Sequence, residues 1–283
     1  MLQNNDIAIL MATYNSDRYV EEQLKSILSQ TYPHWHLYIH DDGSADSTME
    51  ILSRYVEANP DRITIHDYPS QGNAYANFMS LLSRVDSQLY MFADHDDVWH
   101  TDKVEKSYEA YRQQKAVTPD RPVIVHTDLC VVDADLHVIN PSFWSMAGIH
   151  PEMFRTQGSR ITNVVTGCTM LFDDAVKQCA IVRTPYGSPL HDEWVTVCAC
   201  AKGGVVVPVH EALIDYRQHG DNTLGAEVCC NTKNFAFYVS NVLSLFKENI
   251  ENYKTLRSAG YGSYLKYIFY KIHNFMYYQL KYK

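Results

Sequence analysis

Carboxylate side chains are concentrated in two short strings of this 283-residue chain, DDGS at 41–44 and DHDD at 94–97. Carboxylate oxygens are the ligands that Mg²⁺ and Mn²⁺ prefer, and one or two suffice when substrate oxygens and water complete the shell. Asp94 and Asp96 are two residues apart, with the side chain between them pointing elsewhere. They could therefore ligate one divalent cation from the end of a strand. The alternative for 94–97 is a cap for a helix that begins at Val98.

Apolar runs and amphipathic segments alternate around these strings. Strands are expected at 6–12, 35–39, 63–65 and 89–92, with helices at 19–30, 49–56 and 77–82. This order predicts a doubly wound α/β fold with a Rossmann-like, mainly parallel central sheet flanked by helices. Such sheets bind ligands beyond the carboxyl ends of their strands. TYN at 13–15, DDGS and DHDD all follow strands, so we expect the three strings to meet at one edge, although each alone is typical of a turn.

The second half of the chain has a less regular pattern. Strands are expected at 123–126 and 131–132, then a loop-rich stretch to Gly158, the string TGCTMLF at 166–172, a helix after His191, and a strand pair at 205–209 and 212–219. From about Asn231 the sequence is typical of a helical tail. We therefore expect one domain, large enough for an enzyme, over 1–230 and a helical extension over 231–283.

Composition excludes several classes of protein. The net charge of -9 argues against nucleic acid as a partner. No run of 18 to 20 apolar residues is present, and the first residues lack the pattern of a secretory signal, so a cytoplasmic location is expected. Seven cysteines without regular spacing indicate reduced thiols. A zinc site is the alternative interpretation for four of them, Cys198, Cys200, Cys229 and Cys230.

An ordered set of strings resembles the family-two nucleotide-sugar glycosyltransferases of the GT-A fold. The set consists of ATYNSDRYVEEQLKSILSQTYPHWHLYIHDDGSADST, QGNAYANF, FADHDDVW, TGCTMLF, PLHDEW and LIDYRQHGDNTLGA, and it covers about residues 6 to 225. The set is most similar to the branch of rhamnosyltransferases and related enzymes of surface-polysaccharide assembly. This resemblance implies a GT-A catalytic domain whose nucleotide-binding half is about 1–120 and whose acceptor half is about 121–230. It also implies Mn²⁺ or Mg²⁺ and a dTDP- or UDP-linked sugar donor, with rhamnose or a hexose as the sugar.

The resemblance assigns roles to residues around the donor. Those expected at the base and ribose are Thr13, Tyr14, Asn15, Asp41, Asp42, Gly72 and Asn77. Asp94 is expected toward the ribose, Asp96 on the metal and Asp97 in support. His95 stands where the family often has glutamine, so a contact with either metal or sugar stays open. The string DGS is also a common turn, and Gly72 and Asn77 would equally suit a helix cap and core.

The resemblance also identifies Asp192 as the general base that activates the acceptor hydroxyl by inverting chemistry. Such a base typically contributes about 10² to 10⁴ in rate. The alternatives are N-capping by Asp192 and a share of the role for Glu193, where many relatives carry an aromatic residue. The string at 166–168 is expected to form the floor between donor and acceptor.

A late loop that resembles the family's diphosphate-binding element begins at Arg217. Arg217 could bind phosphate through paired donors. His219 could complete the metal shell or neutralise the leaving group, and Asn222 follows in the same loop.

The last 33 residues combine aromatic and basic side chains. Residues 251–283 hold six Lys or Arg against one Glu, a local net charge of about +5. This composition suits the headgroup layer of an anionic membrane, where a lipid-linked glycan acceptor would lie at the inner face of the plasma membrane. The alternatives are packing on the catalytic domain and a homodimer contact.

Two other functions use similar residues. A sugar nucleotidyltransferase is disfavoured because no glycine-rich loop with arginine and lysine lies near the N-terminus. A non-catalytic module that binds nucleotide sugars is the second alternative. A processive synthase would require membrane-spanning helices.

Overall fold

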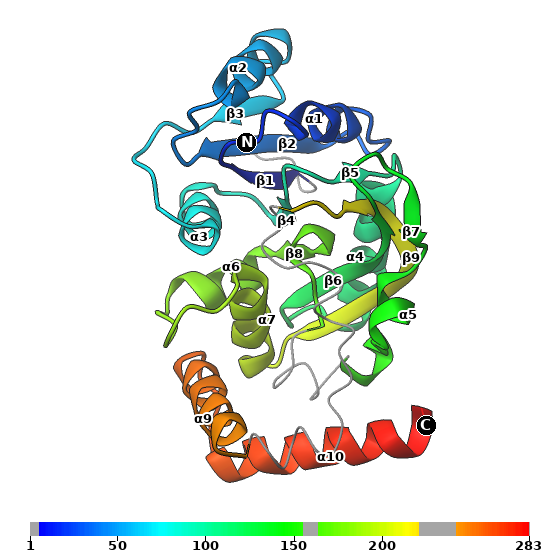
Figure 1. Cartoon of the computed structure of the whole chain (residues 1–283). Coiled ribbons are helices and arrows are strands. Elements are labelled where there is room, and N and C mark those ends of the chain that lie inside the picture. The colour runs from blue at the N-terminus through cyan, green and yellow to red at the C-terminus, as the bar shows by residue number, and fades with distance from the viewer. Residues whose placement is uncertain (1–5, 155–163, 221–241, 283) are drawn as a thin grey trace.

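Figure 1 shows the computed structural model, which describes residues 6–154, 164–220 and 242–282. Its centre is a nine-stranded sheet with the strand order β3-β2-β1-β4-β8-β6-β9-β5, and β7 pairs with β6 off this path. Helices lie on both faces of the sheet (Figure 1). The expected α/β architecture is therefore confirmed.

The first half is the regular part of the sheet. Its elements are β1 (Ile7–Thr13), α1 (Val20–Leu28), β2 (Trp35–Asp41), α2 (Thr48–Ala58), β3 (Ile63–Ile65), α3 (Ala74–Arg84) and β4 (Leu89–Ala93). β1 pairs in parallel with both β2 and β4, with Thr13 opposite Asp41 and Met11 opposite Ala93. This register brings the ends of β1, β2 and β4 to one edge, as the sequence predicted.

The second half of the sheet contains strands that run in both directions. Its strands are β5 (Val98–Trp99), β6 (Val123–Val132), β7 (Val138–Asn140), β8 (Leu171–Asp173) and β9 (Val205–Arg217). Its helices are α4 (Lys103–Val117), α5 (Phe143–Ala147), α6 (Asp174–Ile181) and α7 (His191–Ala201), with the 3₁₀ helices η1 (Pro151–Phe154) and η3 (Gly167–Thr169). β8 is antiparallel to both β4 and β6, whereas β6 and β9 are parallel. The sheet is thus parallel in its first half and mixed in its second.

Three details correct the sequence-based elements. The strands expected at 123–126 and 131–132 are one strand, β6, and those at 205–209 and 212–219 are one strand that ends at Arg217. Val98 does not begin a helix, because Val98 and Trp99 pair with β9 in an antiparallel bridge. The polar interiors of β6 and β9 interrupt the apolar pattern, and register shifts between the two strands absorb the irregularity.

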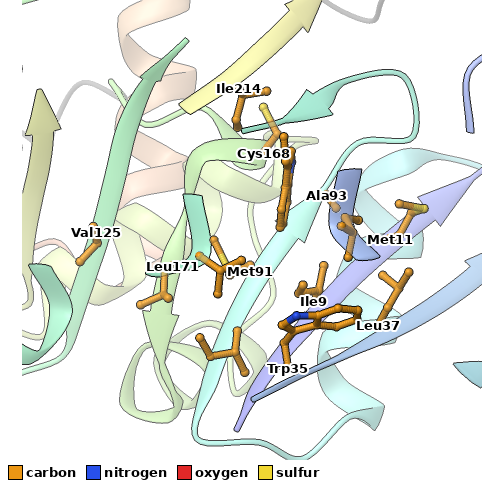
Figure 2. Packing of buried hydrophobic residues seen from close by; sticks show 14 of the residues in the cluster. Ile9, Met11, Trp35, Leu37, Met91, Ala93, Val125, Cys168, Leu171 and Ile214 are labelled. Atoms are coloured by element: carbon orange, nitrogen blue, oxygen red, sulfur yellow. The ribbon is translucent and has the colours of Figure 1, made fainter. Parts of the chain in front are cut away.

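Two apolar cores lie on opposite faces of the sheet. Successive β1 residues alternate between them, with Ile7, Ile9 and Met11 in the first core and Ala8, Leu10 and Ala12 in the second. Helices α1, α2 and α4 cover the first core, part of which Figure 2 shows, and α3, α6 and α7 cover the second. Since all seven residues of β1 are buried, its continuous apolar run is explained by cover on both faces.

The C-terminal helices α9 (Val242–Ser258) and α10 (Tyr264–Tyr282) belong to the second core through Leu256 and Tyr267, and the turn between them does so through Ala259 and Tyr261. These two helices are therefore packed on the rest of the protein by at least part of their surface. Within the described residues, no helix has the length and apolar character to cross a membrane.

Candidate active site

The ends of β1 and β2 are joined by a network of short hydrogen bonds. The Thr13 hydroxyl donates to Asp41 Oδ2 at 2.9 Å, and Asp41 Oδ1 accepts from the backbone N–H of Ser44 at 2.7 Å. Asn15 adopts a positive φ of 47°, and its Oδ1 accepts from the N–H of Ala45 at 2.9 Å. Asp41 and Asn15 thus fix the two loops, whereas the Tyr14 side chain is 59% exposed at their rim.

Asp42 fixes the next loop along the chain. Its carboxylate accepts from the Ser70 hydroxyl at 2.9 Å, from the N–H of Gln71, and from the N–H of Gly72 at 2.9 Å. Gly72 has a φ of +79°, a conformation that favours glycine. Asp42 therefore holds the loop at 70–72 through its backbone N–H groups, and Gly72 adopts the positive φ of that loop.

Asn77 lies inside the protein. It is 2% exposed, and its Oδ1 lies 2.7 Å from Nδ1 of His40. The Asn77 carboxamide thus pairs with a side chain of β2 inside the protein. The N-cap of α3 is Asn73, whose side chain accepts from the N–H of Ala76 at 2.9 Å. This arrangement matches the helix-and-core interpretation of Asn77.

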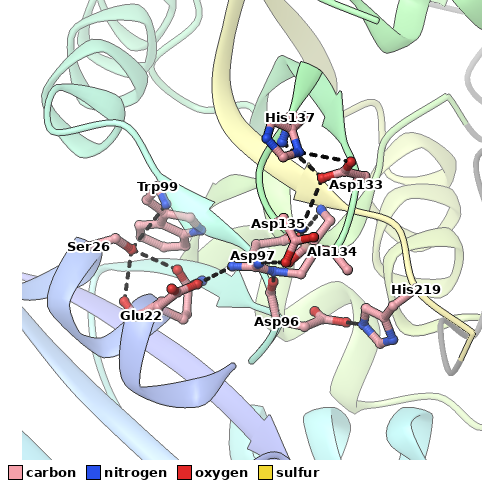
Figure 3. Close-up of polar contacts among 12 residues, drawn as sticks. Glu22, Ser26, Asp96, Asp97, Trp99, Asp133, Ala134, Asp135, His137 and His219 are labelled. Carbon is pink, nitrogen blue, oxygen red and sulfur yellow. Dashed lines mark hydrogen bonds and ion pairs between the residues drawn. The ribbon is translucent and has the colours of Figure 1, made fainter. Parts of the chain in front are cut away.

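Asp96 and His219 meet although 123 residues separate them in the sequence. Asp96 Oδ2 lies 2.8 Å from His219 Nε2, and the two side chains are 11% and 10% exposed (Figure 3). The ring of Tyr19 lies 4.9 Å from the His219 ring and supports it. His95 is close enough for the Asp96 charge to act on it, although burial, the larger effect, lowers the pKa of His95.

Arg217 points into the protein at this site. The guanidinium donates to the carbonyl oxygens of Asp96 at 2.8 Å and Ala134 at 2.5 Å, and pairs with Glu22. It also stacks over the Tyr19 ring at 4.5 Å, and the residue is only 2% exposed. This geometry differs from the expected contact with a diphosphate, because Arg217 here holds the backbone that carries Asp96.

Asp94 is partly exposed and lies in a cluster with two buried side chains. Asp94, Asp97 and Cys168 each place one possible ligand atom within 4.8 Å of the others. Burial, followed by the charges of Asp96 and Asp192, raises the pKa of Asp94 to about 7. The pKa of Asp97 is raised well above its usual value for the same reasons, burial and neighbouring carboxylates.

Asp192 reaches this cluster from the first turn of α7. The helix cap is Leu190, so Asp192 does not serve as the N-cap. Asp192 is 7% exposed, and burial raises its pKa to about 7 despite a hydrogen bond from the N–H of Glu193 at 2.6 Å. Because its charge acts on Asp94, the expected general base and the expected ribose contact lie in one site.

The TGC string packs against the start of α7. A Cβ added to Gly167 would lie 2.5 Å from Nε2 of His191 and 3.6 Å from Cβ of Asp192. The absence of a side chain at Gly167 thus allows the 166–168 segment to approach the start of α7 closely, in addition to any approach of a sugar. Cys168 is fully buried next to it.

Two residues of α1 support the site and were not identified from the sequence. Gln23 donates from Nε2 to the carbonyl oxygen of Asp94 at 2.9 Å, and Glu22 pairs with Arg217. A signal existed for Gln23, since it is fully buried on the apolar face that also carries Val20 and Leu24. A polar side chain in such a position needs a partner inside the protein.

Carboxylate oxygens and an imidazole nitrogen are ligands that a hard divalent cation can take. Asp96 pairs with His219, whereas Asp94, Asp97 and Cys168 form a separate group whose possible ligand atoms lie within 4.8 Å of one another. Asp97 Oδ2 is buried without a hydrogen-bond partner among the described residues. The zinc interpretation of the cysteines finds no support in the described part of the chain, where Cys198 and Cys200 lie in the second core. Asn222, Cys229 and Cys230 lie outside the described residues.

Comparisons with known proteins show which family the chain is similar to. The family described as "Glycosyl transferase family 2" matches residues 8–179. The putative teichuronic acid biosynthesis glycosyltransferase TuaG of Bacillus subtilis is 26% identical over 75% of this chain and 78% of its own length. The dTDP-rhamnosyl transferase RfbG of Shigella flexneri is 37% identical over 35% of this chain and 36% of its own length.

Solved structures show the same fold. TarS of S. aureus in complex with UDP has a TM-score of 0.58 at 14% identity, and the match covers 85% of this chain and 75% of that one. The mannosyltransferase PcManGT from Pyrobaculum calidifontis, in complex with GDP-Man and Mn²⁺, has a TM-score of 0.56 at 15% identity. That match covers 91% of this chain and 74% of PcManGT.

Proposed function

Because this chain belongs to glycosyl transferase family 2, we propose that it transfers a sugar from a nucleoside-diphosphate donor to a hydroxyl of a surface polysaccharide. One observation carries the proposal. Three separate parts of the sequence converge beyond the end of β4, and they supply Asp94 and Asp96, Asp192, and His219. The name of TuaG, a putative teichuronic acid biosynthesis glycosyltransferase, supports a polysaccharide as the acceptor class.

The donor is proposed to lie across the ends of β1, β2 and β4. Tyr14 would contact the base with its exposed ring, and Asp94 would face the ribose. Asp96 and His219 would hold Mn²⁺ or Mg²⁺, which neutralises charge on the departing diphosphate. A dTDP-linked rhamnose or a UDP-linked hexose is the proposed donor, since relatives are named as a dTDP-rhamnosyl transferase and a UDP-Glc glucosyltransferase.

The acceptor is proposed to approach from the side of α7. Asp192 would take the proton of the acceptor hydroxyl, and a pKa of about 7 suits a base that works near neutral pH. Attack on the anomeric carbon then breaks its bond to the diphosphate in a single displacement. The product would have the inverted anomeric configuration.

The test is a binding panel followed by turnover. UDP, dTDP and GDP are added with and without Mn²⁺, and the melting temperature is recorded, since a ligand that binds only the folded state raises it. We expect UDP or dTDP to stabilise the protein more with Mn²⁺, and Asp96→Asn to lose the Mn²⁺-dependent part. Sugar release from the matching donor is then followed by chromatography. Stabilisation without turnover would favour the non-catalytic module, and no stabilisation by any nucleotide would refute the proposal.

We further propose that α10 rests on an anionic membrane that carries a lipid-linked acceptor, at the inner face of the plasma membrane. One face of α10 packs on α9, where Tyr267 is fully buried and its hydroxyl donates to Asn249 Oδ1 at 3.1 Å. The opposite face presents Leu265, Phe269 and Ile272, which are 79%, 64% and 55% exposed. These positions follow helical spacing and form an apolar stripe within a segment of net charge about +5.

Point variants of the stripe test this contact. Wild-type protein is expected to sediment with phosphatidylglycerol vesicles, more weakly at high salt, and the Leu265→Ser, Phe269→Ser, Ile272→Ser variant is expected to stay in solution. The control is the Val138→Ser, Ile139→Ser variant, because these side chains are 62% and 57% exposed but lie on β7, outside the stripe. Unchanged sedimentation of the triple variant would reject the membrane contact. A dimer lost in that variant would assign the stripe to a homodimer instead.

A further inference from the structure

Strand β9 bulges where it passes the middle of β6. Thr127 pairs with Val209, and the next residue, Asp128, pairs with Ala212. The two residues between Val209 and Ala212, one of which is His210, therefore leave the ladder. Bulges of this kind re-aim side chains and are common beside functional sites.

A cavity of about 470 Å³ lies beside the bulge. It is formed by the middle of β6, helix α5, the η1 turn and β9, and its polar and aromatic lining residues are Asp128, Ser142, Trp144, His150, Glu152 and His210. His210 Nε2 lies 2.8 Å from Glu152 Oε1, so the bulge places the imidazole within hydrogen-bonding distance of a carboxylate of η1. The volume is within the range of small-molecule sites.

The wall of the cavity is fixed by hydrogen bonds. Asp128 accepts from the backbone N–H of Trp144 at 3.0 Å and from the Ser142 hydroxyl at 2.5 Å. The Trp144 residue is 6% exposed, so its ring is held in place by the surrounding packing. A rigid indole beside a carboxylate is suited to binding without prior rearrangement.

A second observation comes from His126, which lies behind this wall. His126 is fully buried, its ring is 5.2 Å from the Trp144 ring, and it shares a face of β6 with Asp128, two residues on. Neither ring nitrogen has a hydrogen-bond partner among the described residues. Burial lowers the pKa of His126 to about 3, so a neutral ring with one donor and one acceptor lies behind Trp144, outside the lining of the cavity.

The lining chemistry selects a class of ligand. No Lys or Arg is among the lining residues, and two carboxylates are, which disfavours phosphate and other anions. A neutral sugar suits the site, because its hydroxyls can donate to Glu152 and accept from the imidazoles of His150 and His210.

The same strand connects this cavity to the proposed active site. Ala212 lines the cavity, and Arg217 lies five residues later on β9, where it holds Asp96. At about 3.3 Å per residue this is roughly 17 Å along the strand. The cavity is thus too far away for the reacting hydroxyl, but its position suits a sugar further back in the same glycan.

We propose that this cavity is a subsite for a neutral sugar unit of the acceptor glycan, distant from the reacting hydroxyl. The inference rests on the proposed transferase function, because only a transferase has an acceptor glycan. Binding of a sugar in this cavity can nevertheless be measured without turnover. It assigns Glu152 and His210 as contacts that determine acceptor specificity, and the bulge of β9 as the feature that places His210.

The test observes the indole N–H signal of Trp144 by NMR, identified with Trp144→Phe. Maltotriose, cellotriose, chitotriose and an oligorhamnoside are titrated to tens of millimolar. We expect at least one to shift the Trp144 signal, and the Glu152→Gln, His210→Gln variant to bind it about tenfold more weakly. Both side chains are about half exposed, so this variant is expected to fold. Glu109→Gln, a charge-matched surface change, is expected to bind normally.

Two outcomes would overturn the proposal: no oligosaccharide shifts the Trp144 signal, or the double variant binds as tightly as Glu109→Gln. Stabilisation by UDP or dTDP with Mn²⁺ is measured on the same samples. A protein that binds nucleotide but no oligosaccharide refutes only the subsite. A protein that binds oligosaccharide but no nucleotide refutes the transferase proposal.

Discussion

Asp192 is a buried carboxylate that the fold holds near half-ionisation at pH 7, since burial raises its pKa to about 7. If it is the general base, Asp192→Asn is expected to lower kcat by about 10² to 10⁴ with little change in donor affinity. Wild-type kcat should rise about tenfold per pH unit below pH 7 and level off above it, because the base must be ionised. Steady-state rates across pH test this expectation, with Glu193→Gln as the control. Retained turnover in Asp192→Asn would remove it from the role.

The same carboxylate should reduce the stability of the folded protein as pH rises. Asp192 ionises near pH 4 in the unfolded chain but near 7 in the folded one, so its contribution falls between pH 4 and 7 and is constant above 7. Asp192→Asn is therefore expected to gain up to about 4 kcal/mol relative to wild type over this range. The effect is measured as the difference in unfolding free energy between the two proteins, because other groups also change stability with pH. Burial lowers the pKa of His126 and of His191 to about 3, so both histidines make the folded protein more stable as pH rises. Urea unfolding of both proteins at pH 4 and 7.5 measures it, and parallel pH profiles would contradict it.

Arg217 is expected to act on the metal site through the Asp96 backbone. Arg217→Lys keeps the charge but cannot make all the hydrogen bonds to Asp96, Ala134 and Glu22. We expect Mn²⁺ affinity to fall by about 10- to 100-fold, with nucleotide affinity in the absence of metal unchanged. Isothermal titration measures both, and Arg18→Lys is the control, because Arg18 stacks on the same Tyr19 ring at 4.9 Å but is exposed. A loss of metal-free nucleotide affinity would restore the direct diphosphate contact expected from the sequence.

The comparison of Asp96 with Arg217 shows what a sequence can reveal about single residues. The string DHDD identifies a cluster of oxygen ligands by itself, because the carboxylates are adjacent in the chain. The partner of Arg217 is Glu22, 195 residues away, and no local pattern links the two. The sequence thus predicted where the acidic side chains gather, whereas the direction in which Arg217 points required the fold.

Helix α7 positions Asp192, and its start depends on the close approach of Gly167. Gly167→Ala would place a Cβ 2.5 Å from Nε2 of His191, so the helix must shift or the loop must move. We expect a loss of about 1 to 3 kcal/mol in stability and a larger loss in kcat than in donor affinity. Thermal unfolding and steady-state rates test this. Gly262→Ala, with open space around its Cβ, should change neither, and a normal kcat in Gly167→Ala would show that the contact does not position the base.

Elements with uninterrupted patterns were predictable, and those that depend on pairing were not. β1 and β4 are continuous apolar runs, and α1 and α3 repeat at helical spacing. β5 has only two residues, too few for any period to appear, and it exists because Val98 and Trp99 pair with β9. β6 and β9 appeared as separate pieces, since the bulge and the buried polar residues between them break the alternation.

The tail and the catalytic domain share one core, and this changes what a deletion should do. Leu256, Ala259, Tyr261 and Tyr267 are at most 8% exposed and belong to the second core with α6 and α7. A boundary near residue 230 followed from composition, which cannot show which face of a helix is covered. Removal of all residues after 250 would expose the surface that these side chains cover.

Such a truncated protein is therefore expected to melt roughly 10 °C lower than the full chain, because each large apolar side chain contributes roughly 1.5 to 3 kcal/mol by burial. The triple serine variant of Leu265, Phe269 and Ile272 should melt at the wild-type temperature, since these side chains are exposed. Differential scanning fluorimetry compares the three proteins without ligand. An unchanged melting temperature after truncation would show that residues 1–250 fold independently of the tail, and the vesicle experiment could then use the deletion directly.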